Sequence, residues 1–242
     1  AGPYVLGISS GASLGVALVV LAGVGSSIGV AAAAWIGAAA VLLGVPLGVA
    51  MGYYAGLHRL LNLFLGMFRP IPPLAWVPLV LAWFGVSSLA TAMGLPRSEL
   101  YYYLNNLKIS MLFIIFIGAL FPILTSAVHG VQTVNRTLVD SARVLGASER
   151  DIFTKILLPA AAPSIVNGLR IGLGVAWMCL VSAEMLPGSL SGVGYLITHA
   201  YTVGRTDVVI AGMISISVVG ALLDMAFQWI ERRKYAWKQF SR

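Results

Sequence analysis

The stretch that decides the fold and its use is residues 140–159, Asp140-Ser141-Ala142-Arg143-Val144-Leu145-Gly146-Ala147-Ser148-Glu149-Arg150-Asp151-Ile152-Phe153-Thr154-Lys155-Ile156-Leu157-Leu158-Pro159. It is polar and charged, yet long apolar segments lie on both sides of it. Its spacing runs from Asp140-Ser141-Ala142 through three residues to Gly146, then through nine residues to Ile156 and Leu158-Pro159. A single well-formed polar loop between apolar segments predicts contact with a soluble partner.

The local pattern of this loop predicts two short helices. The first is amphipathic and runs from Leu138 to Gly146, where a glycine allows the chain to turn and another backbone to approach closely. The second begins at Ser148, which is a favoured N-cap residue, and carries Glu149 and Asp151 near the positive end of its dipole. We expect this second helix to run to Leu158 and to end at Pro159.

The composition places the chain in the membrane. Hydrophobic residues make up 59% of it, charged residues only 10%, and the mean hydropathy is +0.93. A soluble domain usually has about 25% charged residues. The charged residues of this chain are therefore too few to cover the surface of a soluble protein. The net charge of +7 could indicate nucleic-acid binding, but the distribution of the charges indicates membrane topology instead. We therefore expect a polytopic, all-α membrane protein with no nucleic-acid partner.

Six segments are long and apolar enough to span a bilayer, which needs ~20 apolar residues per helix. The third contains four prolines, which must kink or break it. Broken backbone at membrane depth is tolerated where it is buried in protein or lines a cavity, so this segment is a candidate pathway wall. The six expected spans are roughly 4–25, 29–56, 60–86, 109–128, 163–187 and 206–230.

Basic residues predict the orientation, because cytosolic loops carry an excess of Lys and Arg. With both termini inside, 12 of the 15 basic residues lie on the cytosolic side, and Arg97, Lys108 and Arg205 lie outside. Shifting the topology by one span would invert this excess. The same arrangement puts residues 140–159 in the cytosol, where a soluble partner could reach them.

Few side chains could carry chemistry. Glu184 and Asp224 are intramembrane acids, which usually face a protein interior. Glu184 could line or gate a pathway or act as a hydrogen-bonding hub, and Asp224 could pair with a basic residue. Arg170 could attract an anion or lie at the interface with its charge in water. His58, His129 and His199 show no metal-ligand spacing, and the chain contains no phosphate-binding Gly-x-x-x-x-Gly-Lys-Ser/Thr loop.

Residues 140–159 resemble the loop by which membrane subunits of ATP-binding-cassette (ABC) importers dock on their ATPases, Glu-Ala-Ala, three residues, Gly, nine residues, Ile, one residue, Leu-Pro. Asp140 and Ser141 stand where that pattern has Glu and Ala. The segment from Arg69-Pro70-Ile71-Pro72-Pro73 to Trp83-Phe84-Gly85 is similar to the third span of type I permeases for nitrate, sulfonates, taurine and bicarbonate. The runs 181–186 and 192–197 resemble the end of the fifth span of that group, so the likeness covers about residues 44–242.

The N-terminal residues resemble a different group. The run from Gly2-Pro3-Tyr4 to Gly15, together with Trp35-Ile36-Gly37-Ala38, is similar to type II permeases for iron-siderophore, haem and cobalamin uptake. Type II permeases have more spans and another fold, so one chain cannot satisfy both. We give more weight to the C-terminal likeness, because it is longer and includes the docking loop. Residues 1–43 are then an atypical beginning of a single permease domain of residues 1–242, which ends in a basic tail, 231–242.

The type I likeness implies about six spans, a cytosolic coupling helix, and a multi-pass permease of a prokaryotic inner membrane. It implies contact with lipid, cytosolic ATPase subunits that hold ATP-Mg, a solute-binding protein outside and a second permease copy, but no catalytic residue, metal or cofactor in this chain. The expected docking residues are Asp140, Ser141, Ala142, Leu145, Gly146, Ala147, Ile156, Leu158 and Pro159. The expected pathway residues are Pro70, Pro72, Pro73, Trp76, Pro78, Arg170, Trp177 and Glu184. A type II permease, a proton-driven carrier and a membrane scaffold are the alternatives.

Overall fold

A computed structural model of the chain describes residues 27–92, 94, 105, 108–186, 189 and 192–234. Within those residues no strand longer than the isolated pairing of Ser88 with Lys108 occurs, which confirms the expected all-α fold. The elements are α2 (Ser27–Tyr53), α3 (Ala55–Phe68), η1 (Pro73–Trp76), α4 (Val77–Phe84), α5 (Leu89–Ala92), α7 (Ile109–Gln132), α8 (Arg136–Val144), α9 (Glu149–Asp151), η2 (Ile152–Leu157), α10 (Leu158–Glu184), α11 (Val193–Thr202) and α12 (Thr206–Lys234).

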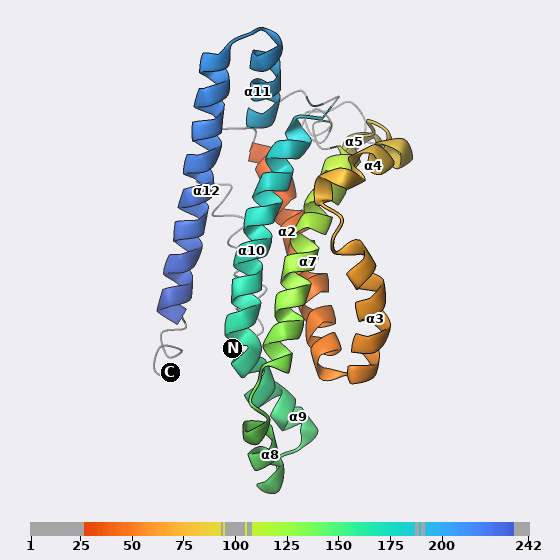
Figure 1. The fold of residues 1–242 in the computed structure, drawn as a ribbon, viewed down its shortest axis with the longest axis vertical. Coiled ribbons are helices and arrows are strands. Elements are labelled where there is room, and N and C mark those ends of the chain that lie inside the picture. Colours follow the sequence, from red (N-terminus) through yellow and green to blue (C-terminus); the bar gives the residue numbers. More distant parts are fainter. Residues whose placement is uncertain are drawn as a thin grey trace.

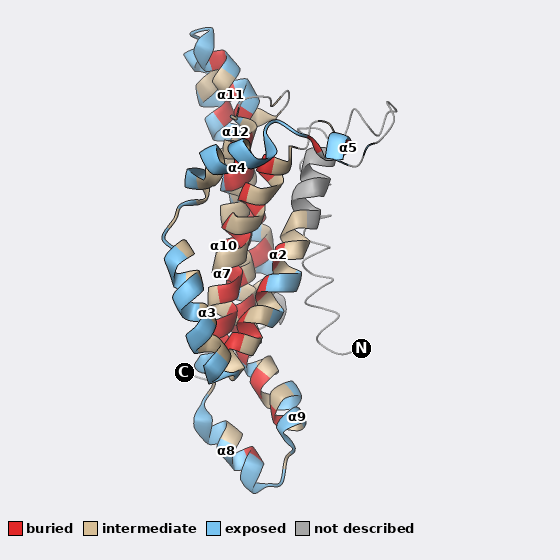
Figure 2. Cartoon of the chain, turned by 90° about the vertical axis from the view of Figure 1, so that its right-hand side faces the viewer, coloured by how far each residue is buried: buried red, intermediate tan, exposed pale blue. Residues whose placement is uncertain are grey.

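The core is formed by three long helices, with α7 packed between α2 and α10 (Figure 1). Buried side chains concentrate where these helices meet, and α8 at the lower end is mostly exposed (Figure 2). A helix satisfies its own backbone hydrogen bonds, so apolar helices of this length can lie in lipid without a polar cost. The largest buried cluster joins all three helices and η2, through Val49, Ala127, Val131, Leu157, Ala161 and Ile165.

Small residues bring these helices close together. A Cβ at Gly48 of α2 would lie 2.7 Å from the carbonyl oxygen of Leu124 in α7. A Cβ at Gly130 of α7 would lie 2.8 Å from the Cβ of Ser164 in α10. Helix association in lipid depends on packing of this kind, because lipid supplies no hydrophobic driving force between helices. We expect larger residues at either position to separate the central helices.

Four helical segments are long and apolar enough to cross a membrane, and a bent pair of helices brings the number to as many as five among the described residues. The four are Ile36–Tyr53, Ile109–Gln132, Glu149–Glu184 and Thr206–Trp229. They correspond to the second, fourth, fifth and sixth expected spans, and the bent pair corresponds to the third. The first expected span, 4–25, lies outside the described residues, so the total of six stays a prediction.

The third expected span is broken, as its prolines predict. Ala55–Phe68 and Pro73–Phe84 meet at an angle of 78°. Pro72 is extended at the break, and Pro73 then begins η1. The inner side of α3 packs through Leu57, Leu61 and Leu65 against a cluster from α2 and α7, whereas α3 itself has no fully buried residue.

The expected end of a helix at Pro159 is wrong. A continuous helical segment runs from Glu149 to Glu184, and Pro159 lies in the first turn of α10, where proline is tolerated because an N–H there needs no helical partner. The preceding segment, η2, is π-helical. Its wider turn leaves room for the proline ring that an α-helical turn would not. The docking loop is therefore joined rigidly to a membrane-spanning helix.

The two ends of the bundle differ. The loop that carries α8 and α9 lies at one end, and α11 with the turn into α12 lies at the other (Figure 1). The α12 helix runs back along the bundle, so its last residues lie towards the end that carries α8.

Candidate functional site

The predicted docking loop, residues 138–159, contains two short helical segments, and a side chain caps the start of each. The Asn135 side chain accepts a hydrogen bond from the Thr137 N–H at 2.9 Å and caps the start of α8. After α8 the chain reverses at Gly146, whose φ is +80°, and the Ala147 N–H donates to the Ala142 carbonyl at 3.0 Å. This is a glycine-terminated helix end that satisfies the last carbonyls. The predicted turn at Gly146 is confirmed, and α8 lies two residues earlier than the predicted helix.

The Ser148 cap is also confirmed. The Ser148 Oγ accepts from the Asp151 N–H at 3.2 Å, and Glu149 and Asp151 lie in the first helical turn. Lys155 Nζ lies 2.6 Å from Asp151 Oδ1. These contacts fix the path of the chain where it returns towards the membrane.

The tip of the docking loop presents apolar side chains to solvent. Val144 is 88% exposed and Leu145 86%, whereas Ala142 is only 9% exposed because it turns towards the returning segment. Leu138 adds a third exposed apolar side chain on α8. Apolar side chains gathered on a polar loop are typical of a protein contact surface.

An exposed ion-pair network links the two helical parts of the loop. Arg143 Nε donates to Glu149 Oε1 at 3.0 Å, and Arg143 Nη1 lies 3.5 Å from Asp140 Oδ1. The hydrogen bond to Glu149 raises the pKa of the Arg143 guanidinium above its ordinary value, so Arg143 stays charged. The network ties α8 to α9 across the turn at Gly146.

The docking loop is also tied to the end of α2. The Tyr53 hydroxyl donates to Glu149 Oε2 at 2.9 Å. The Tyr53 ring packs edge-on against Phe153, with ring centroids 5.4 Å apart. Tyr53 is the last residue of α2, and α3 begins two residues later. These two contacts join α9 and η2 to the turn between α2 and α3.

The two intramembrane acids have different partners. Asp224 of α12 forms a two-pronged ion pair with Arg170 of α10, at 2.6 Å to Nε and 2.9 Å to Nη2, and it also accepts from Gln228 at 2.8 Å. The expected pairing of Asp224 is confirmed, with Arg170 as its partner. Glu184 Oε2 accepts from the Gly194 N–H at 2.9 Å, at the start of α11. Glu184 therefore joins the end of α10 to α11.

Residues 40–235 match the protein family described as binding-protein-dependent transport system inner membrane component. The chain belongs to this family. It is consequently a multi-pass inner membrane protein and a transporter permease component, not an enzyme. The N-terminal run that resembles type II permeases lies before the matched residues, and residues 1–26 lie outside the described structure.

The relatives of this chain are named for the transport of different substrates. The chain is 45% identical over 197 residues to a protein of Methanocaldococcus jannaschii whose provisional name is ABC transporter permease protein, covering 81% of this chain and 66% of the relative. It is 34% identical to the taurine transport system permease protein TauC of Escherichia coli, covering 82% and 65%. It is 37% identical to the nitrate import permease protein NrtB of Leptolyngbya laminosa, covering 69% and 52%. The matches thus span between about half and two thirds of the relatives' own lengths.

The expected docking residues occupy two positions in the permease. Asp140, Ser141, Ala142, Leu145, Gly146 and Ala147 lie together on α8 and its turn. Ile156, Leu158 and Pro159 lie further along, in the helix that leads into the bundle. Contact of either group with an ATPase stays a prediction.

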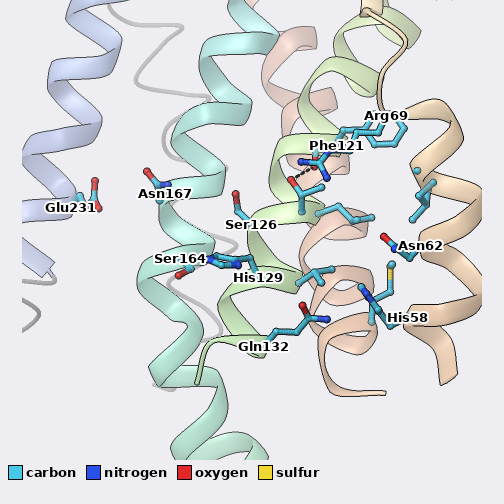
Figure 3. A pocket seen from close by; sticks show the side chains of 16 residues that line it. His58, Asn62, Arg69, Phe121, Ser126, His129, Gln132, Ser164, Asn167 and Glu231 are labelled. Carbon is cyan, nitrogen blue, oxygen red and sulfur yellow. Dashed lines mark hydrogen bonds between the residues drawn. The ribbon is translucent and has the colours of Figure 1, made fainter. Parts of the chain in front are cut away.

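A polar cavity of about 730 Å³ lies beside α3, α7 and α10 (Figure 3). Its lining includes His58, Asn62, Arg69, His129 and Asn167. None of the eight expected pathway residues is among the residues that line it, and their roles stay predictions. Their surroundings differ from the cavity. Trp76 stacks on Phe68 at 5.8 Å, and Arg170 is held by Asp224.

Sequence reasoning missed this lining, although a signal was present. His58, Asn62 and Arg69 are spaced by four and then seven residues, which places them on one face of a helix. Taken one at a time, the three histidines show only the absence of metal-ligand spacing, and His58 joins Asn62 and Arg69 only when helical faces are compared. The described residues contain no group of three or more His, Cys, Asp or Glu side chains arranged to hold a metal ion.

Proposed function

We propose that this chain is the membrane subunit of an ATP-driven importer of a small anion or related solute. Two copies pair around a central pathway, and each binds one cytosolic ATPase through residues 138–159. ATP with Mg²⁺ is held by that partner, and a solute-binding protein delivers the cargo at the opposite face. The N- and C-termini lie in the cytosol. The chain itself makes no covalent bond and supplies alternating access.

The observation that carries this proposal is the shape of the docking loop. The exposed apolar tip consists of Val144 and Leu145. It is joined by the surface ion pair of Arg143 with Glu149 to a helical segment, Glu149–Glu184, that continues into the membrane. A partner that grips the tip and moves it would move α10 as well. A rigid connection of this kind transmits motion, whereas a flexible loop would absorb it.

The cargo class is proposed from the relatives. The names of the matched relatives include taurine and nitrate, both of which carry a delocalised negative charge on oxygen. Two further relatives are named for the transport of aliphatic sulfonates, and the resemblance of the third span also includes bicarbonate permeases. The cargo is thus proposed to be a small oxyanion or a zwitterion that contains one.

Substitution at Gly146 tests the docking proposal. Gly146→Leu forces a bulky residue into a positive φ, which costs about 1–3 kcal/mol of local strain, and it reshapes the tip of the loop. The matched control is Gly204→Leu. Gly204 also has a positive φ, +75°, and an added Cβ at either glycine has no neighbour within 4 Å, but Gly204 lies at the opposite end of the bundle.

The permease, its ATPase and its binding protein are reconstituted in liposomes for this test, and uptake and ATP hydrolysis are measured together. We expect Gly146→Leu to abolish stimulated hydrolysis and uptake and Gly204→Leu to retain both. Equal activity of the two variants would contradict the docking assignment. Transport by the wild-type chain without ATP would contradict the importer proposal itself.

A further inference from the structure

Polar side chains form stripes on three neighbouring helices. On α3 and at its end they are His58, Asn62 and Arg69, which face the cavity defined above. On α7 they are Thr125, His129 and Gln132, spaced by four and three residues, with Ser126 beside them. On α10 they are Ser164 and Asn167. These spacings each keep one helical face polar.

The three stripes converge on the same space. Figure 3 shows Asn62 and His58 on α3, Ser126 and His129 on α7, and Asn167 on the side of α10 that faces α12, and all five line the same cavity. Polar and ionisable groups inside a membrane bundle are costly and usually line a path for ions or substrate. A stripe on one helix could serve helix packing, but stripes on three helices that face one cavity indicate a hydrated passage.

The exposed side chain of Arg69 brings a positive charge to the cavity and, among the described residues, has no counter-ion beside it. Arg69 ends α3, with its N–H bonded to the Leu65 carbonyl, and within the described part of the chain no carboxylate lies within ion-pair distance of it. Arg170, Arg143 and Arg205 each have such a partner. Arg59, Arg136 and Arg150 also have no such partner in the part of the chain that the structure describes, but they do not line the cavity. Among the lining residues, Glu231 alone is acidic, and Figure 3 shows it on α12, beyond α10 from Arg69.

A second polar group also lacks a partner. The Nδ1 atom of His58 is buried and has no hydrogen-bond partner among the described residues. A buried polar atom without a partner costs free energy unless water or a ligand satisfies it. His58 lies on the same face of α3 as Arg69 but roughly 16 Å along the helix from it, so water or an ion that moved along the cavity would meet the two groups in turn.

We propose that this cavity is the inner part of the transport path and that Arg69 directly contacts the transported oxyanion. The proposal rests on the function proposed above and adds the group that selects the charge of the cargo. A guanidinium matches an oxyanion because its planar fork can donate two parallel hydrogen bonds. The cavity is large for a small anion, so Arg69 and the amide, hydroxyl and imidazole groups guide a hydrated ion rather than enclose it.

Arg69 lies where a conformational change of the permease would move its guanidinium. Arg69 lies at the break where α3 ends and η1 and α4 turn away by 78°. A change of angle at this break, driven through the α2–α3 turn by the docking loop, would move the guanidinium relative to α7. Movement of the docking loop would thereby be transmitted to the anion site.

The test uses the full transporter in liposomes, with nitrate, taurine, methanesulfonate and bicarbonate as separate probes. The variants are Arg69→Gln, Arg69→Lys and the control Arg59→Gln, which changes an exposed basic residue ten positions earlier that does not line the cavity. Uptake, binding-protein-stimulated ATP hydrolysis and the amount of bound ATPase are measured for each. The concentration for half-maximal uptake is set by the binding protein and should not move.

We expect Arg69→Gln to lower the maximal uptake rate by about tenfold or more, the size of one lost charge-assisted hydrogen bond, with stimulated hydrolysis and bound ATPase retained. Arg69→Lys should lie between Gln and wild type, because an ammonium keeps the charge but not the fork. Arg59→Gln should match wild type. Uptake by Arg69→Gln within about twofold of wild type would overturn the Arg69 contact and leave the importer proposal standing, and full recovery by Lys would overturn the two-hydrogen-bond geometry. A wild-type transporter that hydrolyses ATP but moves none of the four probes would overturn the oxyanion cargo, and this inference with it.

Discussion

At the scale of single residues, Glu184 acts as a connector between helices. Its carboxylate reaches the Gly194 N–H, one of the backbone donors at the start of α11 that have no helical partner. Gly192 makes this approach possible, because its φ is +113° and a Cβ there would overlap the Glu184 carboxylate. A carboxylate that holds a helix start in this way has a structural use, which fits the expected hydrogen-bonding role better than the gating role.

Substitution of Gly192 tests this connector. Gly192→Ala should destabilise the protein by about 1–3 kcal/mol, because a side chain is strained at that φ and displaces Glu184. Gly174→Ala is the control, since Gly174 is helical with open space around it, and it should be neutral or stabilising by about 0.5–1 kcal/mol. Thermal melting in detergent measures both. A Gly192→Ala protein as stable as wild type would refute the connector.

The Arg170–Asp224 pair gives a second prediction at this scale. Removing either partner leaves a charge without a counter-ion inside the bundle, whereas removing both leaves none. Arg170→Met and Asp224→Leu should each lower the melting temperature more than the double variant does. The expected coupling energy is about 1–3 kcal/mol. Additive effects of the two substitutions would show that the pair does not hold α12 to α10.

Some of these residue contacts could be predicted from the sequence alone. Gly146 and Ser148 could be assigned to a turn and a cap because those roles depend on neighbouring residues in the chain. The partner of Asp224 could not be identified, because Arg170 is 54 positions away and the pairing depends on how α10 and α12 pack. The same reason hid the contact between Tyr53 and Glu149, which are 96 positions apart.

At the scale of elements, the docking loop is one unit with the ends of α2 and α10. Its link to α10 is covalent and helical, and its link to α2 is the hydrogen bond from Tyr53 to Glu149 and the packing on Phe153. The prolines of the third span could be recognised as a break from the sequence. The continuity through Pro159 could not, because it depends on the π-helical turn before it.

Tyr53→Phe tests whether the α2 link transmits motion. The variant keeps the ring against Phe153 and removes only the hydroxyl, so one exposed hydrogen bond of about 0.5–1.5 kcal/mol is lost. We expect uptake per ATP hydrolysed to fall by a few-fold, about 2–10, with the ATPase still bound. The control is Tyr54→Phe, since the Tyr54 hydroxyl makes no hydrogen bond within the described residues. Equal coupling in the two variants would show that motion passes through α10 alone.

At the scale of the whole molecule, the two ends of the bundle should face opposite sides of the membrane. Arg150 lies in the docking loop, and Val203 lies in the turn between α11 and α12 and is 63% exposed. In a chain whose buried Cys179 is replaced by Ser, Arg150→Cys should react with a membrane-impermeant maleimide only in inverted vesicles. Val203→Cys should react only in intact cells. The reverse pattern would invert the proposed topology.

Most of the whole-molecule fold followed from hydropathy, because spans longer than a bilayer is thick can be recognised one at a time. Five of the expected spans have counterparts among the described helices, and the membrane class was right for the same reason. The polar cavity could not be found in this way. It exists only because faces of α3, α7 and α10 meet, and that depends on packing at glycines such as Gly48 and Gly130.

If the exposed tip of α8 binds an ATPase, the ATPase should remain with the chain during purification, and a charge at the tip should release it. The chain is co-expressed with the proteins encoded beside it and purified in detergent as wild type, as Leu145→Asp and as Leu196→Asp, which changes a half-exposed leucine on α11 at the opposite end of the bundle. Mass spectrometry then measures the ATPase bound per chain. We predict about one copy for wild type and Leu196→Asp, as in a symmetric assembly, and almost none for Leu145→Asp. Wild type that purifies without an ATPase, or Leu145→Asp that retains one, would contradict binding at the tip.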